Sequence, residues 1–136
     1  MQKSKIEVTN IRIKRAYEPA CEIDGTRMLV DRLWPRGLSK KRAALTIWMK
    51  EIAPSTELRT WFGHDPNRFE EFSKRYRIEL AANNAAVEKA IGFVKLGPVT
   101  LLYAAHDEVH NHAVVLAQYL RDVLERDGKR RSGRPH

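Results

Sequence analysis

Apolar residues predict strands at three places along the chain. Apolar and polar residues alternate over residues 5–15, with a one-residue slip at Asn10 that predicts a bend or bulge. Apolar runs at residues 27–30 and 99–103 predict buried strands, and the second run is unbroken and rich in β-branched residues. The segment 46–52 fits a strand and a helix equally well.

From Pro54 onward the apolar spacing is that of helices. Phe69, Phe72, Tyr76 and Leu80 form one apolar stripe at helical spacing. Capping signals predict where the helices begin and end. The predicted helices are one over 40–45 after Ser39, one from Ser55 or Thr56 through Trp61, one after Asp65-Pro66, one carrying Val87 to Val94 and closed by Gly97-Pro98, and a last one capped by Asp107 with Val109 on its apolar face.

Strands separated by helices predict a sheet in which the strands are mostly parallel. We therefore expect a single three-layer α/β domain with helices packed on the faces of this sheet. The length of 136 residues suits one domain that folds without a metal or a disulfide. Residues 129–136 contain four basic residues, no acid and no apolar periodicity. The predicted domain is therefore 1–128, followed by a basic tail, 129–136, that we expect to be disordered.

Charge favours an anionic partner in general. The chain has 25 Lys and Arg against 17 Asp and Glu, which gives a formal net charge of +8 at pH 7. A small anionic ligand and a nucleic acid both fit this balance. No apolar stretch approaches the ~20 residues of a membrane helix, the start lacks a signal segment, and Cys21 has no second cysteine to pair with. We expect a cytoplasmic protein without a membrane partner, and, in the absence of a Gly-rich phosphate loop, without a cofactor.

Candidate functional residues follow the predicted strands. In an open parallel sheet, ligands bind beyond the carboxyl ends of the strands. This rule selects the segments 14–17, 31–37 and 106–112, which together hold many of the charged and titratable residues. The sequence thus predicts one site where these three segments meet.

The segment DRLWPRG is the strongest candidate for anion binding. Arg32 and Arg36 flank Trp34-Pro35, and guanidinium groups bind phosphate or carboxylate with two parallel hydrogen bonds. Asp31 follows a buried strand and needs a partner, for which Arg32 and Arg15 are the candidates. The alternative is an internal Asp–Arg pair, with Trp34 in the core and Arg36 in solvent.

The segment HDEVHNH suggests metal ligands only weakly. His106 and His110 are four residues apart, as in helical zinc motifs, but the predicted helix begins at Asp107, so the two do not share a helical face. Two ligands without a third are weak grounds for a metal site, and neutral surface histidines are the favoured interpretation. Asn111 either presents its amide to a ligand at the helix N-terminus or faces solvent.

Five strings in the sequence resemble the YeaO-like family of the domain-of-unknown-function 488 group. They span roughly residues 11–120 and occur in family order. The resemblance implies a compact cytoplasmic α/β domain and implies no established reaction. The strings are KRAYEP, DGTRMLVDRLWPRGLSK, WMKEIAPSTELRTWFGHDP, FEEFSKRYRIEL and GPVTLLYAAHDEVHNHAVVLAQYL.

The resemblance also carries over individual polar positions. At His106 the family usually has Arg or Lys, which weakens the metal hypothesis further. More distant members look like LVDVR…P followed by LLC.E…CHR, with their Cys near Asn111, so thiol chemistry is not transferred to this chain. The positions that carry over are Lys14, Arg15, Asp31, Arg32, Arg36, Asp107 and Asn111.

Two functional hypotheses follow, and whether the protein is an enzyme stays open between them. In the first, an intact or degenerate small enzyme has an anion pocket in which Asp31 or Asp107 is general base or cation ligand and Asn111 orients the substrate. Under it, Arg36→Ala abolishes ligand binding. The second is a nucleic-acid-binding module that uses the segment 40–42 and the tail. The anion-binding residues of the first hypothesis are Lys14, Arg15, Arg32, Trp34 and Arg36.

Overall fold

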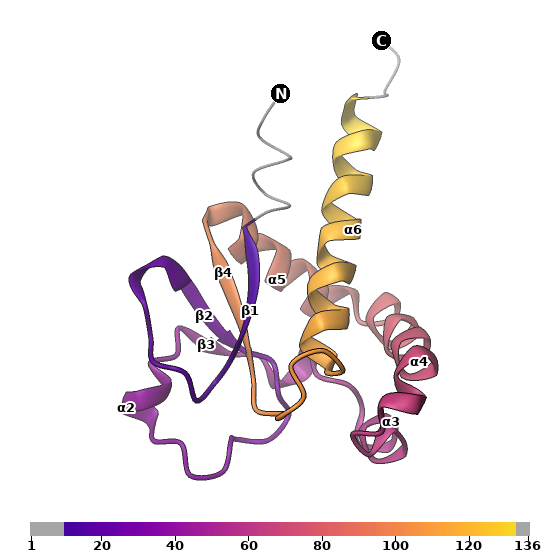
Figure 1. Cartoon of the computed structure of the whole chain (residues 1–136). Coiled ribbons are helices and arrows are strands. Elements are labelled where there is room, and N and C mark those ends of the chain that lie inside the picture. Colours follow the sequence, from indigo (N-terminus) through magenta and orange to yellow (C-terminus); the bar gives the residue numbers. More distant parts are fainter. Residues whose placement is uncertain (1–9, 133–136) are drawn as a thin grey trace.

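The computed structural model describes residues 10–132, with side chains described as far as residue 128. Its centre is one four-stranded parallel sheet (Figure 1). In spatial order the strands are β1 (Ile11–Arg15), β4 (Val99–Tyr103), β2 (Thr26–Leu29) and β3 (Ile47–Trp48). The predicted class, a single α/β domain with a parallel sheet, is confirmed.

Strand β4 is the central strand because its sequence is apolar on both faces. Val99 pairs with Ile11 of β1 on one side and with Thr26 of β2 on the other. All five residues of β4 are buried. An uninterrupted apolar run of this kind is typical of a strand that is covered on both faces and paired on both edges.

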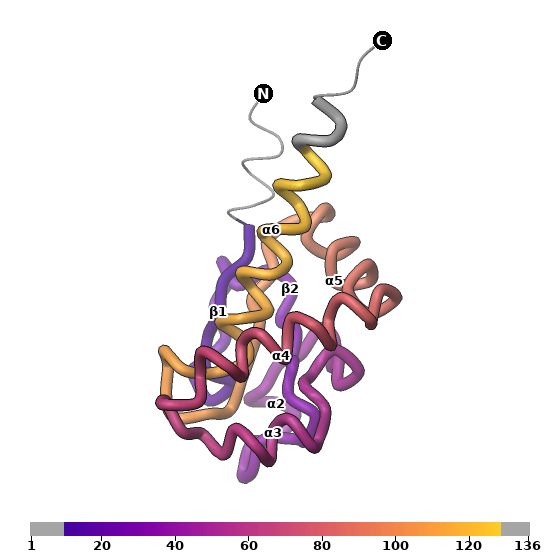
Figure 2. Tube along the Cα trace, turned by 90° about the vertical axis from the view of Figure 1, so that its right-hand side faces the viewer, coloured from indigo at the N-terminus to yellow at the C-terminus, as the bar shows by residue number. Residues whose placement is uncertain are grey.

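The helices are distributed unevenly over the two faces of the sheet. The helices of the described residues are α2 (Lys40–Ala43), α3 (Thr56–Phe62), α4 (Phe69–Ala81), α5 (Asn84–Leu96) and α6 (His112–Ser132), and the 3-10 turns are η1 (Glu22–Asp24), η2 (Lys50–Ile52) and η3 (Pro66–Arg68). Figure 2 shows α3, α4, α5 and α6 on the viewer's side of the strands, with α2 behind them.

Each face of the sheet has its own apolar cluster. Met28 and Leu101 belong to the large cluster under α3, α4, α5 and α6, whereas the adjacent Leu29 and Leu102 belong to a small cluster with Ala43 of α2. Successive side chains of a strand point to opposite faces, so one buried strand contributes to both clusters. A short helix and loops are enough to cover the smaller one.

Most predicted helix ends are confirmed by their caps. The Ser55 hydroxyl accepts a hydrogen bond from the Leu58 N–H at the start of α3, and Ser39 does the same for α2. Gly63, with φ of 55°, ends α3. The ambiguous segment 46–52 divides into β3 and η2.

The start of the last helix was predicted wrongly. Asp107 does not cap α6; its carboxylate closes a separate turn, and α6 begins at His112. The Asn111 side chain caps this helix by accepting a hydrogen bond from the Val114 N–H. Val109 therefore lies in the turn, 64% exposed, and not on an apolar helix face.

Two further predictions concern the ends of the chain. Residues 5–9 of the predicted first strand lie outside the described residues, as do residues 133–136 of the predicted tail. Helix α6 continues to Ser132, within the segment assigned to that tail, so the boundary between domain and tail stays a prediction. Within residues 10–132, no helix has the length and apolar character needed to cross a membrane.

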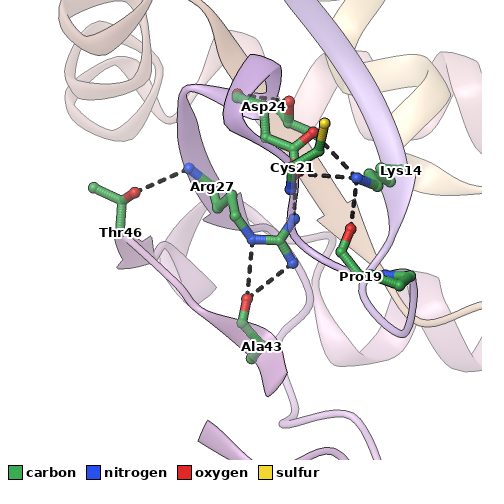
Figure 3. Close-up of polar contacts among 8 residues, drawn as sticks. Lys14, Pro19, Cys21, Asp24, Arg27, Ala43 and Thr46 are labelled. Atoms are coloured by element: carbon green, nitrogen blue, oxygen red, sulfur yellow. Dashed lines mark hydrogen bonds and ion pairs between the residues drawn. The ribbon is translucent and has the colours of Figure 1, made fainter. Parts of the chain in front are cut away.

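A buried ionic cluster joins β1 and β2 to the end of α2 (Figure 3). The Asp24 carboxylate accepts hydrogen bonds from Arg27 at 2.6 Å, from Lys14 at 3.0 and 3.1 Å and from the Cys21 N–H at 2.9 Å. Arg27 also donates twice to the Ala43 carbonyl oxygen. Burial acts to raise the pKa of Asp24, but these donors and cations outweigh it and hold that pKa below its ordinary value. Lys14, predicted to bind an anion, is thus an internal ion-pair partner.

Candidate functional site

A pocket of about 590 Å³ opens where β2 and β4 end. Residues after the carboxyl ends of both strands form one side of it, and α3 with the residues that follow it forms the opposite wall. The start of α6 closes the inner end. The lining residues are Asp31, Arg32, Leu33, Ala53, Pro54, Arg59, Phe62, His64, Phe72, Ala104, Ala105, His106, Asp107, Asn111 and His112.

Asp31 connects the two strand ends at the pocket. Its Oδ2 accepts a hydrogen bond from the Ala104 N–H at 3.1 Å, and its backbone carbonyl accepts one from the Trp48 indole. The partner of the carboxylate is His112, not the predicted Arg32 or Arg15. Asp31, which the sequence predicted as a site residue from its place after β2, thus links the ends of β2 and β4.

His112 lies between two acceptors. Its Nε2 is 2.9 Å from Asp31 Oδ1 and 3.0 Å from the Val30 carbonyl oxygen. Since both neighbours accept hydrogen bonds, Nε2 carries the proton, and that single N–H points at Val30. Asp31 Oδ1 is consequently buried beside a histidine without receiving a hydrogen bond, despite the short ion-pair distance.

Asp107 and Asn111 build the turn that leads into α6. Asp107 Oδ1 accepts hydrogen bonds from the N–H groups of Val109 and His110, and Oδ2 contacts His110 Nδ1 at 2.9 Å. These contacts, chiefly the two backbone bonds, lower the pKa of Asp107 to about 2. Asn111 is 1% exposed, and its amide donates to the Asp107 carbonyl while its oxygen caps α6. Both oxygens of Asp107, and one N–H and the oxygen of Asn111, therefore hold the turn and the start of α6.

The predicted metal candidates are separated by this turn. His110 faces Asp107 and meets Phe69 edge-on, with ring centroids 5.2 Å apart, whereas His106 is exposed and lines the pocket. Among the described residues that were searched, no three or more His, Cys, Asp or Glu side chains are grouped so that they could hold a metal ion. The sequence was right that His106 precedes the helix.

Of the predicted anion-binding residues, only Arg32 lines the pocket. It donates to the carbonyl oxygens of Ala53 and Pro54, at 3.1 and 3.2 Å, and is thereby held against the wall. Arg15 instead donates to the carbonyl oxygens of Ala104 and Ala105, behind the pocket wall. Its guanidinium thus holds the two residues that follow β4, and it does not line the pocket.

Trp34 and Arg36 lie elsewhere in the domain. Trp34 packs with the small apolar cluster on the other face of the sheet and donates to the Leu38 carbonyl. Arg36 is exposed, and its backbone carbonyl accepts a hydrogen bond from the Tyr17 hydroxyl. Neither side chain lines the pocket, and their placement agrees with the structural alternative for Trp34 and Arg36.

Three polar residues that line the pocket had no role in the sequence-based hypotheses. Arg59 and His64 come from α3 and the residue after its glycine cap, and only the packing of α3 beside the strand ends brings them there. His112 had a usable signal, because it follows Asn111 as a histidine follows the cysteine in the CHR string of the distant relatives. The predicted residues that do line the pocket are Asp31, Arg32, His106, Asp107 and Asn111.

Comparison with known proteins places this geometry in a family. The family described as "Inactive DUF488-N3 subclade" matches residues 10–135. The chain is 46% identical over 114 residues to the uncharacterized protein YeaO of Escherichia coli (strain K12), which covers 84% of this chain and 99% of the relative. It is 44% identical over 117 residues to the uncharacterized protein Rv3073c of Mycobacterium tuberculosis (strain ATCC 25618 / H37Rv), covering 85% and 97%. No solved structure matches. The chain therefore belongs to the YeaO-like DUF488 family, within the subclade described as inactive.

Proposed function

We propose that this domain binds a small organic anion in the strand-end pocket and does not turn it over. The observation that carries the proposal is Arg59. This exposed residue lines the pocket, and its guanidinium makes no hydrogen bond or ion pair with the side chains and backbone described for residues 10–128. A free guanidinium beside a concave, largely apolar wall suits a carboxylate or phosphate attached to a carbon skeleton.

The charges around the pocket support an anionic ligand. Arg32 and Arg59 are the cationic groups, and His64 and His106 lie on the same wall and rim. The carboxylate of Asp107 is bonded within its turn, and that of Asp31 is largely buried beside the Ala104 N–H and His112, whereas Arg59 is exposed. An anion therefore meets cationic groups first.

Binding without turnover is supported by the state of the predicted catalytic groups. A carboxylate with a pKa of about 2, such as Asp107, is a poor general base near neutral pH. The amide of Asn111 is used by the Asp107 carbonyl and by the cap of α6. The description of the matched family as inactive agrees with this assignment.

The experiment compares Arg59→Gln with Arg36→Gln in the full chain. Thermal-shift and calorimetric titrations with phosphate, acetate, butyrate and benzoate measure binding. A ligand at 100 times its Kd stabilises the native state by about 2.7 kcal/mol. Arg59→Gln should weaken binding about tenfold or more, since a charged hydrogen bond contributes about 1.5–3 kcal/mol. Arg36 is also exposed but lies outside the pocket, so Arg36→Gln should bind like the wild type.

Two outcomes contradict the proposal. If none of the anions shifts the midpoint, the pocket is not an anion site. If a short DNA duplex shifts it instead, with an effect that salt removes and that Arg59→Gln leaves intact, the nucleic-acid hypothesis is favoured. Lys40, Lys41 and Arg42, which are exposed on α2, would then be the first residues to neutralise.

A further inference from the structure

The pocket has more apolar surface than a simple anion needs. Phe62 and Phe72 form the buried base of its wall as a stacked pair, with ring centroids 4.3 Å apart, and are themselves only 5% and 1% exposed. Leu33 lies on the rim and is 60% exposed, although it is a large apolar side chain. Phosphate or acetate would leave this surface uncovered. A ligand with an apolar body of its own would cover it.

The polar groups of the pocket are mainly planar. Arg59, His64 and His106 are exposed and carry flat, delocalised side chains. His64 has φ of 57°, an uncommon value for a residue with a side chain, and its ring lies 6.2 Å from that of Phe62. Guanidinium and imidazole groups stack on aromatic faces, whereas an aliphatic chain offers them no π-system.

We propose that the pocket selects a planar aromatic ring that bears a single anionic group. The ring would lie between the exposed side chain of Leu33 and the planar groups of the rim, above the buried Phe62–Phe72 base, and the anion would meet Arg59. This inference rests on the proposed function and adds the class of ligand. A carboxylate and a phosphate offer the guanidinium the same chemistry, so both are tested.

Matched ligands separate the ring from the charge. Calorimetric titration of the full chain uses benzoate, cyclohexanecarboxylate, benzamide, phenyl phosphate and 2-naphthoate. Benzoate should bind about threefold or more tightly than cyclohexanecarboxylate, which keeps the charge and the bulk but lacks the π-system. Benzamide keeps the ring without the charge and should bind at least about tenfold more weakly. 2-Naphthoate should bind most tightly of the carboxylates, because it covers more of the wall.

Two substitutions on exposed positions test the residues without disturbing the core. His64→Asn removes the ring and keeps a residue that tolerates a positive φ. It should reduce the preference for benzoate over cyclohexanecarboxylate. Leu33→Ala should weaken the binding of 2-naphthoate several-fold, whereas Ile23→Ala, at a position 61% exposed and outside the pocket, should not.

The outcomes distinguish this inference from the proposed function. An aromatic preference that His64→Asn reduces and that Ile23→Ala leaves unchanged supports the inference. Equal affinity for benzoate and cyclohexanecarboxylate, with Arg59→Gln still weakening both, overturns the inference and leaves the proposed function in place. Absence of binding by every anion overturns both. Preference for phenyl phosphate over benzoate would identify phosphate as the anionic group.

Discussion

Two aspartates flank strand β2, and they differ in how many of their carboxylate oxygens receive a hydrogen bond. Asp24, just before the strand, has hydrogen-bond donors on both carboxylate oxygens, supplied by Lys14, Arg27 and the Cys21 N–H. Asp31, just after the strand, has one donor on Oδ2 and none aimed at Oδ1. The first cluster is closed by its own residues, whereas the second faces a pocket.

This difference in hydrogen bonding distinguishes the structural ion cluster before β2 from the candidate site after it. A buried charge is tolerated when all its hydrogen-bonding capacity is used, and such a cluster holds elements together. A buried acceptor without a donor is uncommon in a native fold. At the carboxyl end of β2 such an acceptor, Asp31 Oδ1, lies beside a pocket that Arg59 also lines.

The largest expected effect is that of removing the Asp24 charge. Asp24→Asn leaves Arg27, which is buried, without its ionic partner, and breaking a buried pair in this way costs about 3–5 kcal/mol of unfolding free energy. Urea denaturation measures the loss. Glu71→Gln is the control, because its pair with Arg75 is exposed and should contribute about 0.3–0.5 kcal/mol. A loss below about 1 kcal/mol for Asp24→Asn would contradict the structural role.

The next effect concerns the packing beside Asp24. Gly25 has φ of 63°, and a Cβ there would lie 2.3 Å from the Pro98 carbonyl oxygen. Gly25→Ala should therefore destabilise the fold by about 1–3 kcal/mol or more. Gly92→Ala, in helix α5 with open space at its Cβ, should instead stabilise by up to about 1 kcal/mol. Thermal unfolding of both variants tests the contrast, and equal effects would refute it.

A smaller effect is expected at the other aspartate. Asp31→Asn retains an oxygen for the Ala104 N–H and removes a carboxylate oxygen that receives no hydrogen bond. The free energy of unfolding should change by about 1 kcal/mol or less, which urea denaturation measures beside Asp24→Asn. Equal losses of stability in the two variants would contradict the difference in hydrogen bonding between Asp24 and Asp31.

The smallest effect is the contribution of Asp107 to acid stability. Its pKa in the folded protein, about 2, lies below the ordinary value of 3.8, so folding favours the ionised form. The stabilisation is present above about pH 4 and is lost as the pH falls toward 2. Asp107→Asn should therefore flatten the decline of Tm between pH 4 and pH 2. An unchanged slope would show that the turn is not held by the carboxylate.

Part of the candidate site could be predicted because it depends on local pattern. The apolar run of β4 identified a central strand, and the carboxyl-end rule then selected Asp31, Arg32 and Asp107, all of which line the pocket. The same rule also selected Lys14 and Arg36, which do not line it. A residue's distance along the chain from a strand end does not fix the direction in which its side chain points.

By itself, the sequence determined the class of fold, the central strand, most helix caps and the end of the sheet that carries the pocket. Each of these depends on residues close together in the chain, whose spacing and backbone preferences act locally. Tertiary structure decided that His112 lies beside the Asp31 carboxylate and that Lys14 pairs with Asp24. It also decided that Arg59 of α3 and His64, just after the helix, reach the pocket. These contacts join residues distant in the sequence, and only the packing of helices on the sheet brings their side chains together.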